Sequence, residues 1–206
     1  MRSESAFRRL VNFSDAVVAI AITLLILPLV DSASSIGSMG VGEFFKDNRA
    51  RLFAFALSFA VIGSFWWAQH KMFERVKSYN AVLVWGMFIW LFSIVFLPFP
   101  TELIGSTREN STTVHEIYIG TLLAAAIATL VQQWAIVRWP ALQEAEYRGS
   151  ATIDAAGVSA VLMSVAFVVA GLAPSVGLWA LLVLLLSTPL ERLLRARRSK
   201  RETSRR

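Results

Sequence analysis

The stretch Arg9-Leu-Val-Asn-Phe-Ser-Asp-Ala-Val-Val-Ala-Ile-Ala-Ile-Thr-Leu-Leu-Ile-Leu-Pro28 decides the fold of this chain. Its apolar part, residues 13–30, contains one charged side chain, Asp15. A hydrocarbon core about 30 Å thick needs roughly 17–25 apolar residues per helix, so the stretch predicts a first transmembrane helix. Basic residues before an apolar run also resemble a secretory signal peptide, but the cleavage site is poor and Asp15 opens the apolar region.

Five further apolar segments come after the first one, and each has a length near that of a membrane span. They are residues 52–69, 81–97, 117–137, 153–172 and 176–190. The third is expected to stop at Pro98-Phe99-Pro100, because proline interrupts helices. The pattern predicts an all-α integral membrane protein with six transmembrane helices in one bundle, residues 1–190, and a basic cytoplasmic tail, residues 191–206.

The composition agrees with a chain surrounded by lipid. Apolar residues make up 56% of the chain, charged residues 17%, and the mean hydropathy is +0.58. Soluble domains have roughly 45–50% apolar and about 25% charged residues. The chain has no cysteine and no sequence pattern of a hydrolase nucleophile, phosphate-binding loop or zinc site. We therefore expect neither an enzyme nor a bound metal or cofactor.

The basic residues predict the orientation of the chain in the membrane. Lysines and arginines number three before the first helix, three after the second, two after the fourth and eight in the tail, against four in the remaining loops. The positive-inside rule then predicts that both termini are cytoplasmic. We expect the protein to lie in the plasma membrane. A basic tail beside anionic lipid headgroups explains the net charge of +6, so we expect no nucleic-acid partner.

Two groups of residues in the first two helices are candidates for function. Ile20, Thr23, Leu24 and Leu27 recur at helical spacing on a single face, and Asp15 projects about 140° away from Ile20. Spacing alone favours packing or lipid contact as the explanation of the stripe, and a hydrogen bond to its own helix as the explanation of Thr23. Ser14 or Asp15 could cap a helix, whereas His70 beside Trp67 suits the membrane interface.

These residues resemble a known family, the transmembrane protein 175 family, which comprises the lysosomal potassium channel and its bacterial relatives. The matching motifs are Arg9-x-x-x-Phe13-Ser14-Asp15 with Ala19-Ile20 and Thr23-Leu24-Leu25, then Trp67-x-x-His70, and Leu97-Pro98-Phe99-Pro100-Thr101. The resemblance implies a potassium-selective cation channel, in which the first helix of each six-helix unit lines a central pore without a filter loop. One unit per chain implies a homotetramer.

The resemblance also assigns roles to the candidate residues. The pore constriction and selectivity filter would consist of Ile20, Thr23, Leu24 and Leu27. A structural network would tie helix one to helix two through Arg9, Phe13, Ser14, Asp15, Trp67 and His70, and pH-sensitive gating through His70 would be an extension of it. Potassium would be the permeant ion, with no cofactor.

Two other functions stay open from the sequence. A secondary transporter of a small ion or solute could couple to protons through Asp15 and His70, although no paired repeat supports it. A membrane enzyme or assembly factor would need polar residues at one depth on several helices, and the last three segments are apolar inside.

Overall fold

The computed structural model of this chain describes residues 4–33, 40–106 and 112–147, and nearly all of them are helical. Four helical stretches in this part are long and apolar enough to cross a membrane. They are Glu4–Ala33, Arg49–Phe73, Ala81–Ser106 and Thr113–Arg138. The all-α prediction is confirmed for the described residues. The predicted spans at 153–172 and 176–190, and the tail, lie outside them.

The first span is two helices rather than one. Helix α1, Glu4–Leu24, ends one turn before Pro28, and α2, Leu27–Ala33, begins after a break at residues 25–26. Proline has no N–H and its ring clashes with the carbonyl four residues earlier, so the hydrogen-bond ladder is interrupted there. The N–H groups of Leu25 and Ile26 bond only three residues back, at 3.3 and 3.4 Å.

The third span differs from the prediction that helix three stops at the Pro98 motif, because a further helix follows directly. Helix α5, Ala81–Phe96, starts at Asn80, whose side chain accepts from the Leu83 N–H at 2.9 Å, and it does end beside the prolines. A second helix, α6, Pro98–Ser106, begins immediately after it. Proline is well tolerated at the first position of a helix, where its missing N–H has no intrahelical partner. The motif thus divides the span without ending it.

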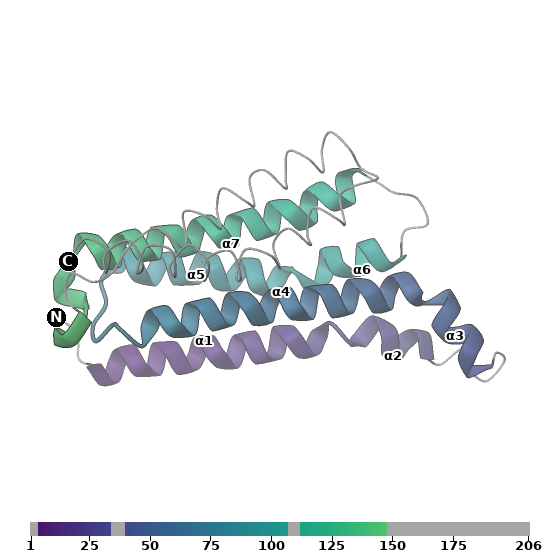
Figure 1. Cartoon of the computed structure of the whole chain (residues 1–206), viewed down its shortest axis with the longest axis horizontal. Helices are drawn as coiled ribbons and strands as arrows, with labels where there is room; N and C mark the ends of the chain where they lie inside the picture. The colour runs from purple at the N-terminus through teal and green to yellow at the C-terminus, as the bar shows by residue number, and fades with distance from the viewer. Residues whose placement is uncertain (1–3, 34–39, 107–111, 148–206) are drawn as a thin grey trace, which may run out of the picture.

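The remaining elements complete a bundle whose long helices run side by side (Figure 1). Helix α3, Val41–Asp47, precedes α4, Arg49–Phe73, and α7 covers Thr112–Arg138. Two short 3-10 turns come next, η2, Pro140–Leu142, and η3, Ala145–Tyr147. We call the end with the start of α1 and the end of α4 the His70 end. The opposite end, with α2, α6 and the start of α4, is the Arg51 end.

Polar side chains hold the helices together inside an otherwise apolar core. Gln69 on α4 donates to the buried Gln132 of α7 at 2.6 Å. The Ser58 hydroxyl of α4 lies 2.8 Å from that of Thr101 and 2.9 Å from that of Tyr118, joining α4, α6 and α7. In a bilayer such interhelical hydrogen bonds contribute about 1 kcal/mol each. These bonds hold α4, α6 and α7 in fixed positions relative to one another, and α1 packs against this group of helices.

Candidate functional site: the exposed face of the first span

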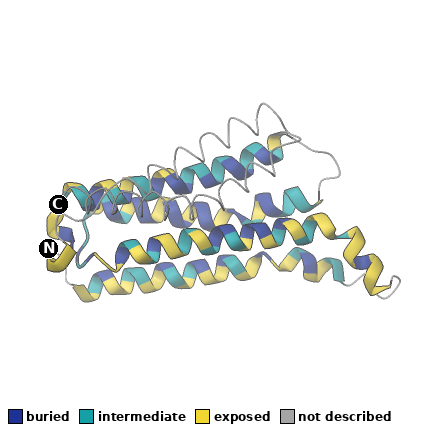
Figure 2. Ribbon diagram, in the orientation of Figure 1, coloured by how far each residue is buried: buried dark blue, intermediate teal, exposed yellow. Residues whose placement is uncertain are grey.

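One side of the first span is fixed against the bundle. Val18 and Ala21 of α1, Leu25 at the break and Leu29 of α2 are all buried. They recur every three or four residues and therefore form one face. Helix α1 packs on α4, α5 and α6. Figure 2 shows this alternation of buried and exposed positions along the span.

The other side of the span carries all four residues predicted to form a constriction. Ile20 is 60% exposed, Leu27 48% and Leu24 39%, and Thr23 is exposed as well. The sequence stripe is therefore a real surface of the protein rather than part of its core. Packing against the described residues, one of the two simple explanations of the stripe, does not account for it. Beyond these residues, lipid, water or another protein surface remains to cover the stripe.

Thr23 is the one hydroxyl in this apolar stripe. Its Oγ1 donates a hydrogen bond to the Ile20 carbonyl at 2.7 Å, as expected for threonine in a helix. The donated proton leaves the oxygen lone pairs available, because a hydroxyl is one donor and two acceptors. The hydroxyl is thus satisfied without a partner outside its helix, and its oxygen still offers a ligand to a cation.

The break at residues 25–26 interrupts the backbone hydrogen-bond pattern beside the stripe. Pro28 cannot donate to the Leu24 carbonyl, and the Leu29 N–H donates to Ile26 at 3.0 Å rather than to Leu25. An unpaired backbone carbonyl facing hydrocarbon costs several kcal/mol, so irregular backbone at membrane depth lies against protein or water.

Asp15 lies on a different side from the stripe and joins α1 to α4. Its Oδ1 accepts a hydrogen bond from the Trp66 indole at 2.9 Å, and the His70 ring stacks on Trp66 with centroids 5.4 Å apart. The prediction named Trp67 for this role. Trp67 is one residue later, hence rotated by about 100°, and is 49% exposed with the Lys71 ammonium 4.9 Å from its ring centroid.

The other members of the predicted network occupy separate environments. Ser14 is buried beside the interface with the bundle, whereas Arg9 and Phe13 lie on the exposed side of α1. His70 Nε2 is 3.5 Å from the Glu74 carboxylate. The structure therefore brings Asp15 and His70 together through Trp66, and it does not bring Arg9 or Phe13 to them.

Several residues that shape the site are not evident from the sequence. The motif favours Trp67 over its neighbour Trp66, and Arg51 stands out in the sequence only as a charge. Gln69 and Gln132 do carry a usable signal, since amides inside apolar segments need partners. Among the described residues, no group of three or more histidine, aspartate or glutamate side chains is placed to hold a metal ion.

A family model supports the resemblance found in the first three helices. Residues 9–98 match the family described as the endosomal/lysosomal potassium channel TMEM175. This region contains the α1 stripe, the Asp15–Trp66 contact and most of the third span. The resemblance to the TMEM175 family is thereby confirmed for this part of the chain.

Curated relatives agree with the family match. The chain is 32% identical over 125 residues to a potassium channel of Chryseobacterium sp. (strain P1-3), covering 60% of this chain and 62% of the relative. It is 33% identical to a potassium channel of Chamaesiphon minutus over 129 residues, or 60% and 63%. A Streptomyces collinus potassium channel is 30% identical over 134 residues, or 63% and 64%. The matched region thus spans a little under two thirds of each relative.

The fold of a solved structure also matches. The crystal structure of a lysosomal potassium-selective channel TMEM175 homolog from Chamaesiphon minutus superposes with a TM-score of 0.76 at 24% identity. The superposition covers 91% of this chain and 98% of that one. At this identity the match establishes the fold, which is that of a multi-span membrane protein.

Proposed function

We propose that this chain, a relative of the TMEM175 potassium channels, is itself a potassium-selective cation channel. Four copies would assemble around one axis in the plasma membrane, with the first span of each copy facing the pore. The names of the relatives support potassium as the permeant ion. No filter loop or cofactor is needed in this mechanism.

The observation that carries the proposal is the exposed face of α1 and α2. It is apolar at Ile20, Leu24 and Leu27, it bears the Thr23 hydroxyl, and it adjoins the break in the helix at residues 25–26. A water-containing pore between copies accounts for all three features together. Lipid contact accounts for the apolar side chains and for a Thr23 hydroxyl that is bonded to its own helix, but it offers no polar neighbour to the interrupted backbone.

Selectivity follows from the cost of removing water. Rings of Ile20, Leu24 and Leu27 would be narrow and apolar, so an ion crossing them loses hydration and gains nothing from the wall. Potassium holds its water less tightly than sodium, so its penalty is smaller. Four Thr23 oxygens would replace part of the lost hydration at one level of the pore.

The remaining topology belongs to the same proposal. Six helices per chain would place both termini, the His70 end and the basic tail on the cytoplasmic side, with the tail near anionic headgroups. The Arg51 end would then face outward. In this arrangement Asp15 is a structural residue that holds α1 on α4 through Trp66.

A proton-coupled transporter is the second candidate, and one observation favours it. Two of the four described spans are interrupted beside prolines, at residues 25–26 and at Leu97. Discontinuous helices are common at the substrate sites of transporters. A carrier saturates with rising ion concentration and responds to a proton gradient, whereas channel current increases with the electrical driving force without saturating.

Reconstitution into liposomes tests the proposed function. Purified protein would be recorded with potassium on one side and sodium on the other, with protein-free liposomes as the control. A current that reverses near the potassium equilibrium potential supports the channel. Saturating, proton-dependent flux would favour the transporter, and absence of potassium flux in a folded tetramer would reject the channel.

A further inference from the structure

Helix α2 is too short to determine its own orientation. It has seven residues, and isolated helices of fewer than about 12 residues are marginal in water. Leu29 is its one buried side chain in the described structure. The break at residues 25–26 separates it from α1, so its tilt depends on the contacts that it makes with the rest of the bundle. Because α2 carries Leu27, that tilt sets where the outer end of the stripe lies.

Arg51, in the first turn of α4, makes a polar contact with α2. Its Nη1 donates to the Ser32 hydroxyl at 2.6 Å, and Ser32 in turn donates to the Pro28 carbonyl at 2.8 Å. The same Nη1 lies 3.2 Å from the Asn48 Oδ1. The guanidinium therefore reaches, through one hydroxyl, the residue that breaks the first span.

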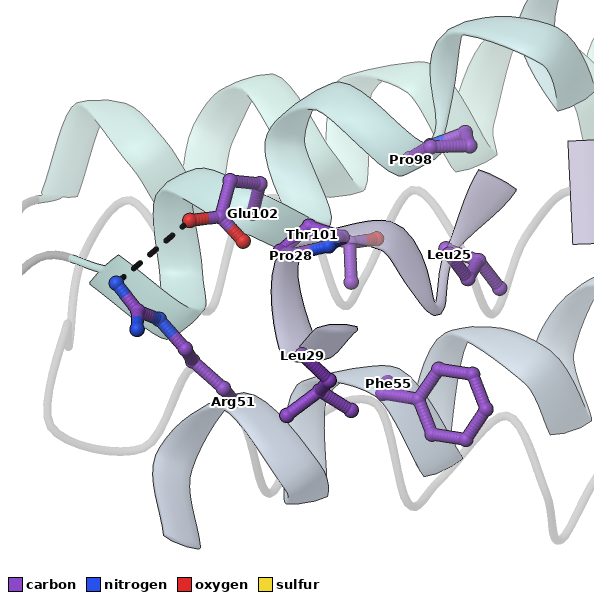
Figure 3. Close-up of a pocket in the computed structure, with 8 residues that line it drawn as sticks. All are labelled: Leu25, Pro28, Leu29, Arg51, Phe55, Pro98, Thr101 and Glu102. Carbon is purple, nitrogen blue, oxygen red and sulfur yellow. Dashed lines mark ion pairs between the residues drawn. The ribbon is translucent and has the colours of Figure 1, made fainter. Parts of the chain in front are cut away.

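The other side of the same guanidinium faces α6. Nη2 lies 3.9 Å from the Glu102 carboxylate, as the dashed line in Figure 3 shows. Both side chains are about one third exposed, at 31% and 36%, so solvent screens this pair only partly. Arg51 thus connects three helices: α2 through Ser32, its own α4, and α6 through Glu102.

Arg51 is packed tightly on the side that faces α6. A Cβ on Gly105 of α6 would lie 2.7 Å from Arg51 Cγ, so only glycine lets the two helices approach this closely. The cavity under the contact, lined by Leu25, Leu29 and Phe55 among others, is about 10 Å³ (Figure 3). Such a space holds about one water molecule at most. A second, open cavity of about 340 Å³ lies beside the contact and is lined by Leu27, Pro28, Asp31, Ser32, Arg51 and Glu102. The contacts of Arg51, rather than close packing on every side, therefore hold α2 in its place.

We infer that Arg51 is a positioning residue of the pore, which fixes the tilt of α2 and hence the width of the constriction at Leu27. The inference rests on the proposed function and adds a determinant outside the pore-facing residues. Arg51 does not touch the stripe. It acts through Ser32 and the Pro28 carbonyl, and its removal lets α2 swing about the break while α1 stays in place.

Permeability measurements in liposomes test the inference with matched variants. Arg51→Ala and Ser32→Ala should each lower the potassium/sodium permeability ratio, by about fivefold for Arg51→Ala, the factor that about 1 kcal/mol produces. Arg51→Lys keeps the charge but loses the fork of donors and should recover part of the ratio. Arg49→Ala is the control, because it removes an exposed charge two residues away on the same helix.

A distance measurement tests the same inference without requiring ion flux. The chain has no cysteine, so Val30→Cys on α2 and Lys71→Cys at the far end of α4 can be spin-labelled uniquely. Helical rise places the labels roughly 30 Å apart. Labelled protein diluted with unlabelled wild type gives distances within one chain. The distribution should broaden with Ser32→Ala and Arg51→Ala, and it should keep its width with Arg49→Ala.

The outcomes separate the two proposals. If wild type carries no potassium current, the channel proposal fails and the distances still decide whether Arg51 orients α2. Suppose that wild type conducts, and that Arg51→Ala and Ser32→Ala have the same potassium/sodium permeability ratio and the same width of distance distribution as Arg49→Ala. The inference about Arg51 is then wrong. Should Arg51→Ala fail to fold, Ser32→Ala decides, since it removes one hydroxyl and leaves the Arg51–Glu102 pair.

Discussion

Two exposed apolar faces of this protein, on α1 and on α5, look alike in hydropathy and exposure but differ in side-chain size and backbone continuity. The α5 face is unbroken and bulky, and consists of Trp85, Phe88, Ile89, Phe92, Val95 and Phe96. The α1 face alternates large residues with Ala16, Ala19 and Thr23, and it ends in a broken backbone. Ile89 is 53% exposed and Ile20 60%, so exposure does not separate them either.

The difference shows which physical features distinguish lipid from water as a neighbour. A regular helix satisfies its own backbone, and large aliphatic and aromatic side chains suit lipid, as on α5. Small residues allow close approach between helices of different subunits. A free hydroxyl oxygen and interrupted backbone are useful only where polar species arrive. The comparison therefore favours lipid as the neighbour of α5 and supports the proposal that α1 lines a pore.

The largest expected effect comes from making each face polar at one isoleucine. Ile20→Asn should raise the single-channel conductance by about 10- to 100-fold, equivalent to roughly 1.4–2.8 kcal/mol of barrier, because an amide wets the apolar ring. Ile89→Asn on α5 is the matched control and should leave the conductance unchanged. Planar-bilayer recordings measure both. Equal conductances in the two variants would remove the distinction between the faces.

A second prediction concerns the buried side of α5, where a substitution should change stability through packing rather than ion conduction. Gly86→Ala places a Cβ 2.8 Å from Gln132 Cγ and should lower the free energy of unfolding by about 1–3 kcal/mol through overpacking. Gly63→Ala meets no atom within 4 Å and should be neutral or stabilising. Thermal unfolding in detergent compares them. Equal stabilities would mean that α5 and α7 are not held closely at Gly86.

The Thr23 hydroxyl gives a third, smaller effect. Thr23→Val keeps the shape, loses the oxygen and should lower the potassium/sodium permeability ratio about fivefold, the factor given by about 1 kcal/mol. Thr23→Ser should retain the ratio. Thr129→Val on α7 removes a hydroxyl with a similar bond to its own helix, 2.9 Å to Ala125, and should have no effect. A ratio unchanged in Thr23→Val would place the filter elsewhere.

The smallest effect is expected where α1 meets α4. Trp66→Phe deletes the hydrogen bond to Asp15 and should cost about 1 kcal/mol of stability, measurable as a lower Tm, while conduction persists. Trp67→Phe removes no bond to Asp15 and serves as the control. Normal stability with lost conduction in Trp66→Phe would instead connect Asp15 to the ion path.

Much of this arrangement can be predicted from residue order alone. The apolar lengths locate the first four spans, and helical periodicity separates Asp15 from the stripe containing Ile20 and Thr23. Those features are local, since they depend on spacing within one helix. The division of the first span is less evident, although Pro28 signals it. Pro98 predicts that the third helix ends there. The neighbouring residues do not show whether the proline is also the first residue of a new helix.

The contacts that the sequence does not reveal depend on how helices rotate against one another. Whether Trp66 or Trp67 meets Asp15 depends on how α4 is rotated about its own axis, because neighbouring residues point about 100° apart. Tertiary packing determines that rotation. Arg51 reaches Ser32 from 19 positions away, across two helices whose relative placement the local sequence does not state. Neither contact leaves a periodic signature in the sequence.

Accessibility to a thiol reagent in water tests most directly whether α1, unlike α5, lines an ion path. Because the chain has no cysteine, Ile20→Cys and Ile89→Cys each introduce a unique target. We predict that a small thiol-reactive cation added to the aqueous phase reduces the potassium current of Ile20→Cys and leaves that of Ile89→Cys unchanged. Inhibition of Ile89→Cys with no inhibition of Ile20→Cys would contradict the account.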